Sequence, residues 1–178
     1  STNTIVSILA GVSLNTLKKK FPNHNCVRAI TNIPITIGKG LTGISWGEYV
    51  ESDHKEFIMN IFKKSSQIYE FNEDYLDIFL ALTSSSPAIV ALIVEALSDG
   101  GLSGGLQKEL SEELVLEMML GTILMLKNNK LTTSDLKNMV TSPAGTTISA
   151  LRVLEKRSFR SALIESIIAA SSRSKEFR

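Results

Sequence analysis

The spacing of apolar and polar residues follows two different patterns along the chain, and the pattern changes near residue 73. In the first third, short apolar runs rich in β-branched residues alternate with helix-like segments. The short runs predict strands over residues 4–9, 26–30, 41–45 and 67–71, with helices over 14–21 and 55–64 between them. Strand–helix–strand order is typical of α/β proteins, so this region is predicted to form part of an α/β sheet.

From about Glu73 onward the pattern is helical only. Pro87–Leu97 is apolar on nearly every side, with Pro87 suited to a first helical turn, and Gln107–Leu126 is a second long helix. Glycines are predicted to end the first helix and asparagines the second: Gly100, Gly101, Gly104 and Gly105, then Asn128 and Asn129. Shorter helices are predicted over residues 135–140, 147–155 and 159–175.

Two long helices without a clear polar face are hard to cover within one short helical segment. A second copy of the chain would cover them, which predicts an intertwined helical dimer. The alternative is a compact monomeric bundle. The predicted organisation is therefore mainly α, with a piece of an α/β sheet before about Glu73 and an all-α region after it.

Composition and charge exclude several classes of function. The 178 residues carry a net charge of +1 and no basic stripe, which argues against a nucleic-acid partner. Single Cys26 fits a reducing, cytoplasmic compartment, and neither His24 nor His54 has neighbours at metal-ligand spacing, so no metal is expected. The apolar stretch Ala88–Val94 is far shorter than the ~20 residues that cross a bilayer, and no signal peptide is evident, so no membrane partner is expected.

A candidate binding feature lies at residues 141–155, TSPAGTTISALRVLE. Its Ser-Pro-Ala-Gly turn precedes two threonines, either of which could cap the helix that follows. A helix N-terminus attracts anions such as carboxylates, and Ala144 and Gly145 are small enough for close approach of a ligand. One threonine hydroxyl would cap the helix, leaving the other for the ligand. The alternative is a plain turn with an N-cap.

The same region carries a resemblance that extends over the whole chain. Leu136–Glu155 resembles the signature LKDxVTSPGGTTIxxLxxLE of the Δ1-pyrroline-5-carboxylate reductase family, and Leu82–Ala88 (LTSSSPA) is similar to its LSGSGPA. Arg28–Pro34 (RAITNIP) resembles RxMPNxP, and Ile8–Val12 (ILAGV) resembles IAAGV. The motifs occur in the family's order.

The resemblance implies a function and a set of site residues. Family members transfer a hydride from NADPH or NADH to the cyclic imine 1-pyrroline-5-carboxylate, giving L-proline. Their fold joins a Rossmann-like dinucleotide-binding domain to a helical dimerisation domain, often assembled into larger rings. The resemblance implies that residues 1–72 are the C-terminal portion of the dinucleotide-binding α/β domain and that residues 73–178 are the helical dimerisation and substrate-binding domain. By analogy, the substrate carboxylate would lie on the amides of Gly145, Thr146 and Thr147, with the Thr147 hydroxyl as the catalytic contact to the ring nitrogen and with Ser142 and Val140 nearby.

Three further residues match positions that the resemblance associates with the cofactor. Asn32 and Pro34 match residues beside the nicotinamide, and Glu73 matches an acidic position where the helical domain begins. Each also has a plain interpretation, with Asn32 and Pro34 as turn formers and Glu73 as a solvated carboxylate in a first helical turn.

Several departures from the family pattern affect the expected activity. Ser84 and Ser86 replace glycines, Ala144 replaces the first glycine of PGG and would be strained at a positive φ, and Lys130 stands where many members have glutamate. No GxGxxG lies between a strand and a helix, so the chain is expected to lack the segment that carries this fingerprint.

Two other functions remain open. The first alternative is a catalytically silent, truncated dimerisation module or remnant, because NADPH would bind weakly without the pyrophosphate-binding turn. The second is a hydroxy-acid dehydrogenase with a helical second domain, which typically uses a lysine on a long helix. No lysine interrupts residues 87–97, which disfavours the second alternative.

Overall fold

The computed structural model describes residues 3–128 and 130–177. They fall into two compact units. The sheet unit consists of the described residues of Ser1–Pro87 and Ile164–Arg178, and the helical unit is Ala88–Leu163. The boundary expected near residue 72 lies inside the first unit and stays a prediction.

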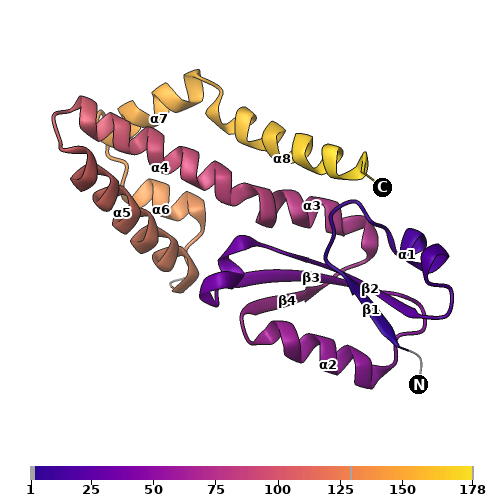
Figure 1. The fold of residues 1–178 in the computed structure, drawn as a ribbon. Helices are drawn as coiled ribbons and strands as arrows, with labels where there is room; N and C mark the ends of the chain where they lie inside the picture. Colours follow the sequence, from indigo (N-terminus) through magenta and orange to yellow (C-terminus); the bar gives the residue numbers. More distant parts are fainter. Residues whose placement is uncertain (1–2, 129, 178) are drawn as a thin grey trace. The chain divides into compact units, whose positions relative to one another are not determined.

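Four strands form the mixed sheet of the sheet unit, and they confirm the predicted strands (Figure 1). They are β1 (Thr4–Ser7), β2 (Asn25–Thr31), β3 (Gly40–Trp46) and β4 (Ser66–Glu70), in the order β1-β2-β3-β4. β1 pairs with β2 and β3 with β4 in parallel, whereas β2 and β3 are antiparallel. The carboxyl ends of β1 and β2 therefore meet at one edge of the sheet.

Helices cover both faces of this sheet and complete its core. α1 (Leu14–Lys20) begins at Ser13, whose side chain accepts a hydrogen bond from the Thr16 amide, and α2 (Ser52–Lys63) connects β3 to β4. One core cluster contains Val27, Ala29, Ile44, Val50 and Ile58, and the second contains Ile30, Leu76 and Phe79. Alternate residues of β2 enter the two clusters, as expected for a strand buried on both faces.

The helix carrying Pro87 begins earlier than predicted. It runs from Glu73 to Ser103 through η2 (Glu73–Tyr75), α3 (Leu76–Leu80), a π-helical turn η3 (Ala81–Ser85) and α4 (Ser86–Ser103). Proline has no amide hydrogen, so Pro87 cannot bond the carbonyl of Thr83 four residues earlier. The Asn32 side-chain amide donates to this carbonyl instead, at 3.2 Å. The π turn and this bond let the helix continue through a proline.

The prediction that Gly100 and Gly101 end this helix is also wrong, because both lie within α4. α4 ends at Ser103, before Gly104 and Gly105, and Gly105 has a positive φ of 99°. A Cβ on Gly101 would lie 2.1 Å from Ser111 Oγ, so Gly101 allows α4 and the next helix to pack closely. Close packing, and not termination, accounts for Gly101.

The remaining helices agree closely with the sequence pattern. They are α5 (Lys108–Asn128), α6 (Thr133–Met139), α7 (Thr146–Lys156) and α8 (Phe159–Lys175). Asn128 is still helical, and Asn129, the other residue predicted to end α5, lies outside the described residues. α6 begins with a capping box between Thr132 and Asp135.

The long helix has a large apolar surface. By length and composition alone, Glu73–Ser103 could cross a membrane, with a mean hydropathy of 1.8 over its most apolar window, of which 22% is buried. Its first turns, however, place Leu76 and Phe79 in the core of the sheet unit. The apolar part that remains in the helical unit is shorter than the ~20 residues that cross a bilayer.

Candidate functional site

The N-terminus of α7 forms the first candidate site, within the helical unit. Its N-cap is Gly145, with an extended backbone (φ −76°, ψ 177°), so the prediction that Thr146 or Thr147 caps the helix is wrong. The Gly145 carbonyl accepts hydrogen bonds from the Ser149 amide at 3.3 Å and the Ser149 hydroxyl at 3.0 Å. Since Gly145 already ends the turn, both threonines lie inside the first helical turn.

This arrangement leaves both threonine hydroxyls available. Among the described residues, neither the Thr146 nor the Thr147 side chain forms a hydrogen bond, and no side chain caps the helix. The first amides of a helix lack partners in the helix itself and carry the positive end of its dipole. The α7 N-terminus therefore presents amides and hydroxyls suited to a small carboxylate with an adjacent nitrogen.

The turn before α7 is shaped by two of the predicted residues. Ser142 lies over Gly145, because a Cβ on Gly145 would come within 2.3 Å of Ser142 Oγ. Val140 is the C-cap of α6 and is 57% exposed. Ala144 has a φ of 59°, a left-handed conformation that costs alanine roughly 1–2 kcal/mol, as expected if this position needed a positive φ.

The second candidate site lies in the sheet unit, where β1 and β2 end. Asn32 and Pro34 stand at the start of η1 (Ile33–Ile37), directly after β2. Asn32 Nδ2 donates to the Thr83 carbonyl, and its Oδ1 accepts from the Leu41 amide at 2.7 Å. The side chain of Asn32 is thus anchored within the protein, and it fixes the loop that carries Pro34.

Exposed apolar side chains directly follow both strands. Ile8 and Leu9, which follow β1, are each 61% exposed, and Ile33 is 66% exposed. Ligands of open α/β sheets commonly bind at the carboxyl ends of parallel strands. The sequence pattern did not assign Ile8 or Leu9 to a site, because it placed both inside the first strand, over residues 4–9, whereas β1 ends at Ser7.

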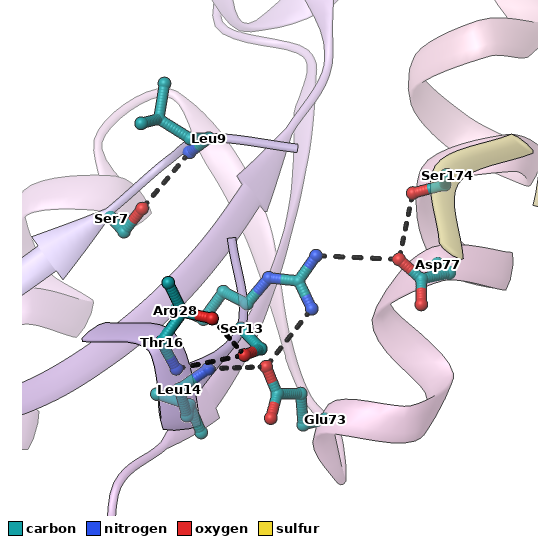
Figure 2. A network of polar contacts seen from close by, with 9 residues as sticks. All are labelled: Ser7, Leu9, Ser13, Leu14, Thr16, Arg28, Glu73, Asp77 and Ser174. Carbon is teal, nitrogen blue, oxygen red and sulfur yellow. Dashed lines mark hydrogen bonds and ion pairs between the residues drawn. The ribbon is translucent and has the colours of Figure 1, made fainter. Parts of the chain in front are cut away.

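Glu73 belongs to a polar network with Leu14, the first residue of α1, and with Arg28 of β2 (Figure 2). Its Oε1 accepts from the Leu14 amide at 2.8 Å and from Arg28 Nη1 at 3.2 Å. Its side chain is 21% exposed, so the interpretation of Glu73 as a solvated carboxylate is wrong. The reason is long-range: Arg28 lies in β2, far from Glu73 in sequence.

Arg28 and its other partners were missed as functional candidates. The Arg28 side chain is fully buried and also approaches Asp77 Oδ1 at 3.5 Å, and this oxygen accepts from the Ser174 hydroxyl at 2.8 Å. An arginine inside the apolar run CVRAI requires a carboxylate partner, because a buried guanidinium keeps its charge. That run, together with acidic residues four apart at 73 and 77, was an available signal.

The two serines that replace family glycines are accommodated by hydrogen bonds. Ser84 Oγ donates to the Thr31 carbonyl, and Ser86 Oγ donates to the Ala81 carbonyl, both at 3.0 Å. Both bonds lie at or beside the π turn, and the first joins it to the end of β2. The two serine hydroxyls therefore stabilise the π turn, at positions where glycine would give the backbone more conformational freedom.

The residues present fit one end of a dinucleotide. Exposed apolar side chains at the carboxyl ends of β1 and β2 suit a nicotinamide ring. The letters GxGxxG occur at residues 38–43, GKGLTG, but this run leads from η1 into β3. Within residues 3–128 and 130–177, no glycine-rich turn of this kind joins a strand to a helix, so the pyrophosphate end has no matching cradle there.

Titratable groups give little indication of metal or thiol chemistry. In the described part of the chain, no group of three His, Cys, Asp or Glu residues is placed to hold a metal ion. Burial raises the pKa of the Cys26 thiol, an effect that nearby Lys18 partly offsets. A thiol with a raised pKa is a poor nucleophile at neutral pH.

Taken together, these features define a protein in which part of an open α/β sheet, with exposed apolar residues after its first two strands, is joined to an all-helical region. Residues 73–177 match the family described as pyrroline-5-carboxylate reductase dimerisation. The chain is 42% identical over 172 residues to a pyrroline-5-carboxylate reductase of Synechocystis, covering 97% of this chain and 64% of the relative. It spans less than two thirds of this relative's length.

Solved structures give the same result. A Plasmodium falciparum pyrroline carboxylate reductase with NADP bound is 31% identical with a TM-score of 0.94, covering 98% of this chain and 71% of that one. A Streptococcus pyogenes 1-pyrroline-5-carboxylate reductase is 26% identical with a TM-score of 0.94, covering 97% and 67%. The chain belongs to the pyrroline-5-carboxylate reductase family.

Proposed function

We propose that this chain provides the substrate-binding and nicotinamide-binding parts of an NAD(P)H-dependent reductase that converts 1-pyrroline-5-carboxylate to L-proline. The observation that carries the proposal is the α7 N-terminus, where Gly145 caps the helix and leaves the amides and hydroxyls of Thr146 and Thr147 without partners among the described residues. Family membership supports the choice of ligand.

In this proposal each part of the α7 site has its own role. The substrate carboxylate lies on the amides of Thr146 and Thr147, where the helix dipole favours negative charge. The Gly145 amide, which was expected to share this role, donates instead to the Ser142 carbonyl at 3.1 Å. The Thr147 hydroxyl bonds the ring nitrogen and orients the imine, while Ser142 and Val140 border the ring. Catalysis is then mainly positioning, because the iminium carbon accepts hydride without a protein nucleophile.

The nicotinamide end of NADPH or NADH is proposed to lie on the edge formed by Ile8, Leu9, Asn32 and Pro34. The cofactor supplies the hydride. Asn32 keeps the loop in place through its two hydrogen bonds, and the exposed apolar side chains exclude water from the ring. The Plasmodium relative was solved with NADP bound, which supports a nicotinamide nucleotide as the cofactor.

A homodimer, able to assemble further, is proposed as the working form. The matched family is a dimerisation family, and the apolar residues along α4 and α5 need cover. A hollow of about 640 Å³ beside α7 is lined only by α7 residues, among them Ile148, Leu151 and Arg152, so a second subunit is expected to supply its other wall.

The test compares two adjacent hydroxyls. Thr147→Ala should lower kcat/KM for 1-pyrroline-5-carboxylate by about tenfold, the effect of losing one hydrogen bond. Thr146→Ala removes a hydroxyl with no proposed contact and should change kcat/KM by less than about twofold. NADPH oxidation measures both. Equal kinetics for Thr147→Ala and the parent protein would remove Thr147 from the site.

A second comparison addresses the catalytically silent alternative. The chain alone and a chimaera extended upstream with the remaining part of the Synechocystis relative should be assayed side by side. Activity in the chimaera supports the reductase sites proposed here. Inactivity of both, with folding intact by circular dichroism, supports the remnant instead.

A further inference from the structure

The loop between β1 and α1, residues 8–13, is fixed by segments that lie far away in the sequence. The Leu14 amide at its end donates to Glu73 Oε1 at 2.8 Å. In its middle, Gly11 has a φ of 74°, and a Cβ there would lie 2.3 Å from Phe177 Cβ and 2.9 Å from the Phe177 carbonyl oxygen. The C-terminal turn therefore packs directly on the loop backbone.

The side chains of the same loop lie at the carboxyl end of β1, where the nicotinamide end of the cofactor is proposed to bind. Ile8 and Leu9 are largely exposed, while the Leu9 amide is turned back toward Ser7 Oγ at 3.4 Å. At the other end, Ser13 caps α1 through the Thr16 amide at 3.0 Å. The loop is thus held at its ends and at Gly11, with its apolar side chains free to meet a ligand.

Arg28 determines where the Glu73 carboxylate can be. Its fully buried guanidinium donates to Glu73 Oε1 at 3.2 Å and pairs with Asp77 at 3.5 Å, and Ser174 in turn donates to Asp77 (Figure 2). A buried guanidinium needs both carboxylates near it. Glu73 Oε1 consequently receives two donors at once, one from β2 and one from the end of the loop.

We infer that Glu73 is a positioning residue, which acts on the nicotinamide end of the cofactor through the Leu14 amide and the loop, and not as a cofactor ligand. The inference rests on the proposed function and refines the prediction that Glu73 binds the cofactor. Arg28 orients the Glu73 carboxylate, and this carboxylate fixes the start of α1. The fixed start of α1 in turn positions the side chains of the loop before it.

Three variants separate this role from direct contact. Glu73→Ala removes the acceptor, and Glu73→Gln keeps an acceptor oxygen without the charge. Leu14→Pro removes the amide donor and leaves Glu73 and Arg28 in place, because proline is tolerated at the first helical position and Ser13 already has the extended backbone (φ −76°, ψ 158°) that precedes proline. Asp74→Ala is the matched control, since Asp74 is exposed and forms no hydrogen bond or ion pair among the described residues.

In the reductase chimaera, Glu73→Ala and Leu14→Pro should each raise KM for NADPH by about tenfold, with KM for 1-pyrroline-5-carboxylate changed by less than about twofold. The double variant should be no worse than Glu73→Ala, because both changes break one interaction. Glu73→Gln should recover part of the loss, and Asp74→Ala should behave like the parent. A higher KM for NADPH in Glu73→Ala without a change in Leu14→Pro would overturn the inference.

Hydrogen exchange in the 178-residue chain provides a readout that needs no activity. Amides of residues 9–13 should exchange faster in Glu73→Ala and Leu14→Pro than in Asp74→Ala. If both the chain and the chimaera lack reductase activity but exchange responds in this way, the proposed function fails while the hold of Glu73 on the loop stands. Unchanged exchange in Glu73→Ala would overturn the positioning role itself.

Discussion

The two units of this protein differ in where their apolar residues find cover. Among the described residues, eleven of the twelve buried apolar side chains belong to the sheet unit, and Val94 alone belongs to the helical unit. The exposed apolar residues of α4 and α5 are instead 40–63% exposed, from Met125 to Leu92. The sheet unit therefore carries its own core, whereas the helical unit leaves a large apolar surface exposed, in keeping with the homodimer proposed above.

The units also differ in how they treat positive φ. Among the described residues, the sheet unit uses only glycine at such positions, Gly11 and Gly38. The helical unit has Gly105 and also three non-glycine residues, Lys130, Ala144 and Ser158, with φ between 52° and 59°. Strain of this kind persists only where surrounding contacts hold it. The helical unit thus carries three strained backbone positions among its described residues.

The largest effect is expected from a charge on the apolar surface of α5. Leu120→Glu, at a side chain 53% exposed, should weaken self-association by about 2–4 kcal/mol, the range for a central interface residue. Light scattering across a dilution series measures it. Ile61→Glu, equally exposed at 53% but in the sheet unit, is the matched control and should leave association unchanged. A parent chain that stays monomeric at every concentration would refute the dependence of the helical unit on a partner.

An effect of similar size but of a different kind is expected in the sheet unit. Ile44 is fully buried, so Ile44→Ala should lower the free energy of unfolding by about 3 kcal/mol through lost burial and a cavity. Urea denaturation measures this loss, which should be the same at low and high protein concentration. Ile37→Ala, at a residue 74% exposed, should cost less than about 0.5 kcal/mol.

The smallest effect concerns backbone strain before α7. Ala144→Gly should raise the free energy of unfolding by about 0.5 kcal/mol, because relief of the left-handed alanine slightly exceeds the entropy that glycine adds to the unfolded chain. Ala150→Gly, in the exposed middle of α7, should lower stability by about 1 kcal/mol. Alanine-to-glycine substitutions six residues apart are thus expected to change the free energy of unfolding in opposite directions. Changes in the same direction would contradict the strain at Ala144.

Much of the fold was predictable because it depends on local pattern. All four strands, α1, α2 and α5 to α8 follow from apolar spacing, turn residues and caps near each element. The errors at Pro87, Gly100 and Gly101 share a cause: single-residue rules for helix termination were overridden by tertiary partners. Asn32 replaces the hydrogen bond that proline lacks, and Ser111 needs a residue without a side chain at Gly101.

The candidate site was predictable only in part, for a related reason. The α7 N-terminus was found because its turn residues are contiguous, although the capping residue was misassigned: Gly145, in an extended conformation, ends the turn before either threonine. The environment of Glu73 could not be read locally, since its partners Leu14 and Arg28 come from α1 and β2. Long-range ion pairs leave only indirect traces in sequence, such as a charge within an apolar strand.

The replacement of one missing hydrogen bond at Pro87 also constrains how the protein can be redesigned. Swapping Pro87 for a residue with an amide would offer Thr83 a helical donor, in competition with the Asn32 side chain. The helix would then be more regular, but the loop after β2 would lose the hydrogen bond by which Asn32 attaches it to the helix. The irregularity at Pro87 therefore leaves a carbonyl group that holds the loop after β2, and making the helix regular should make this loop more mobile.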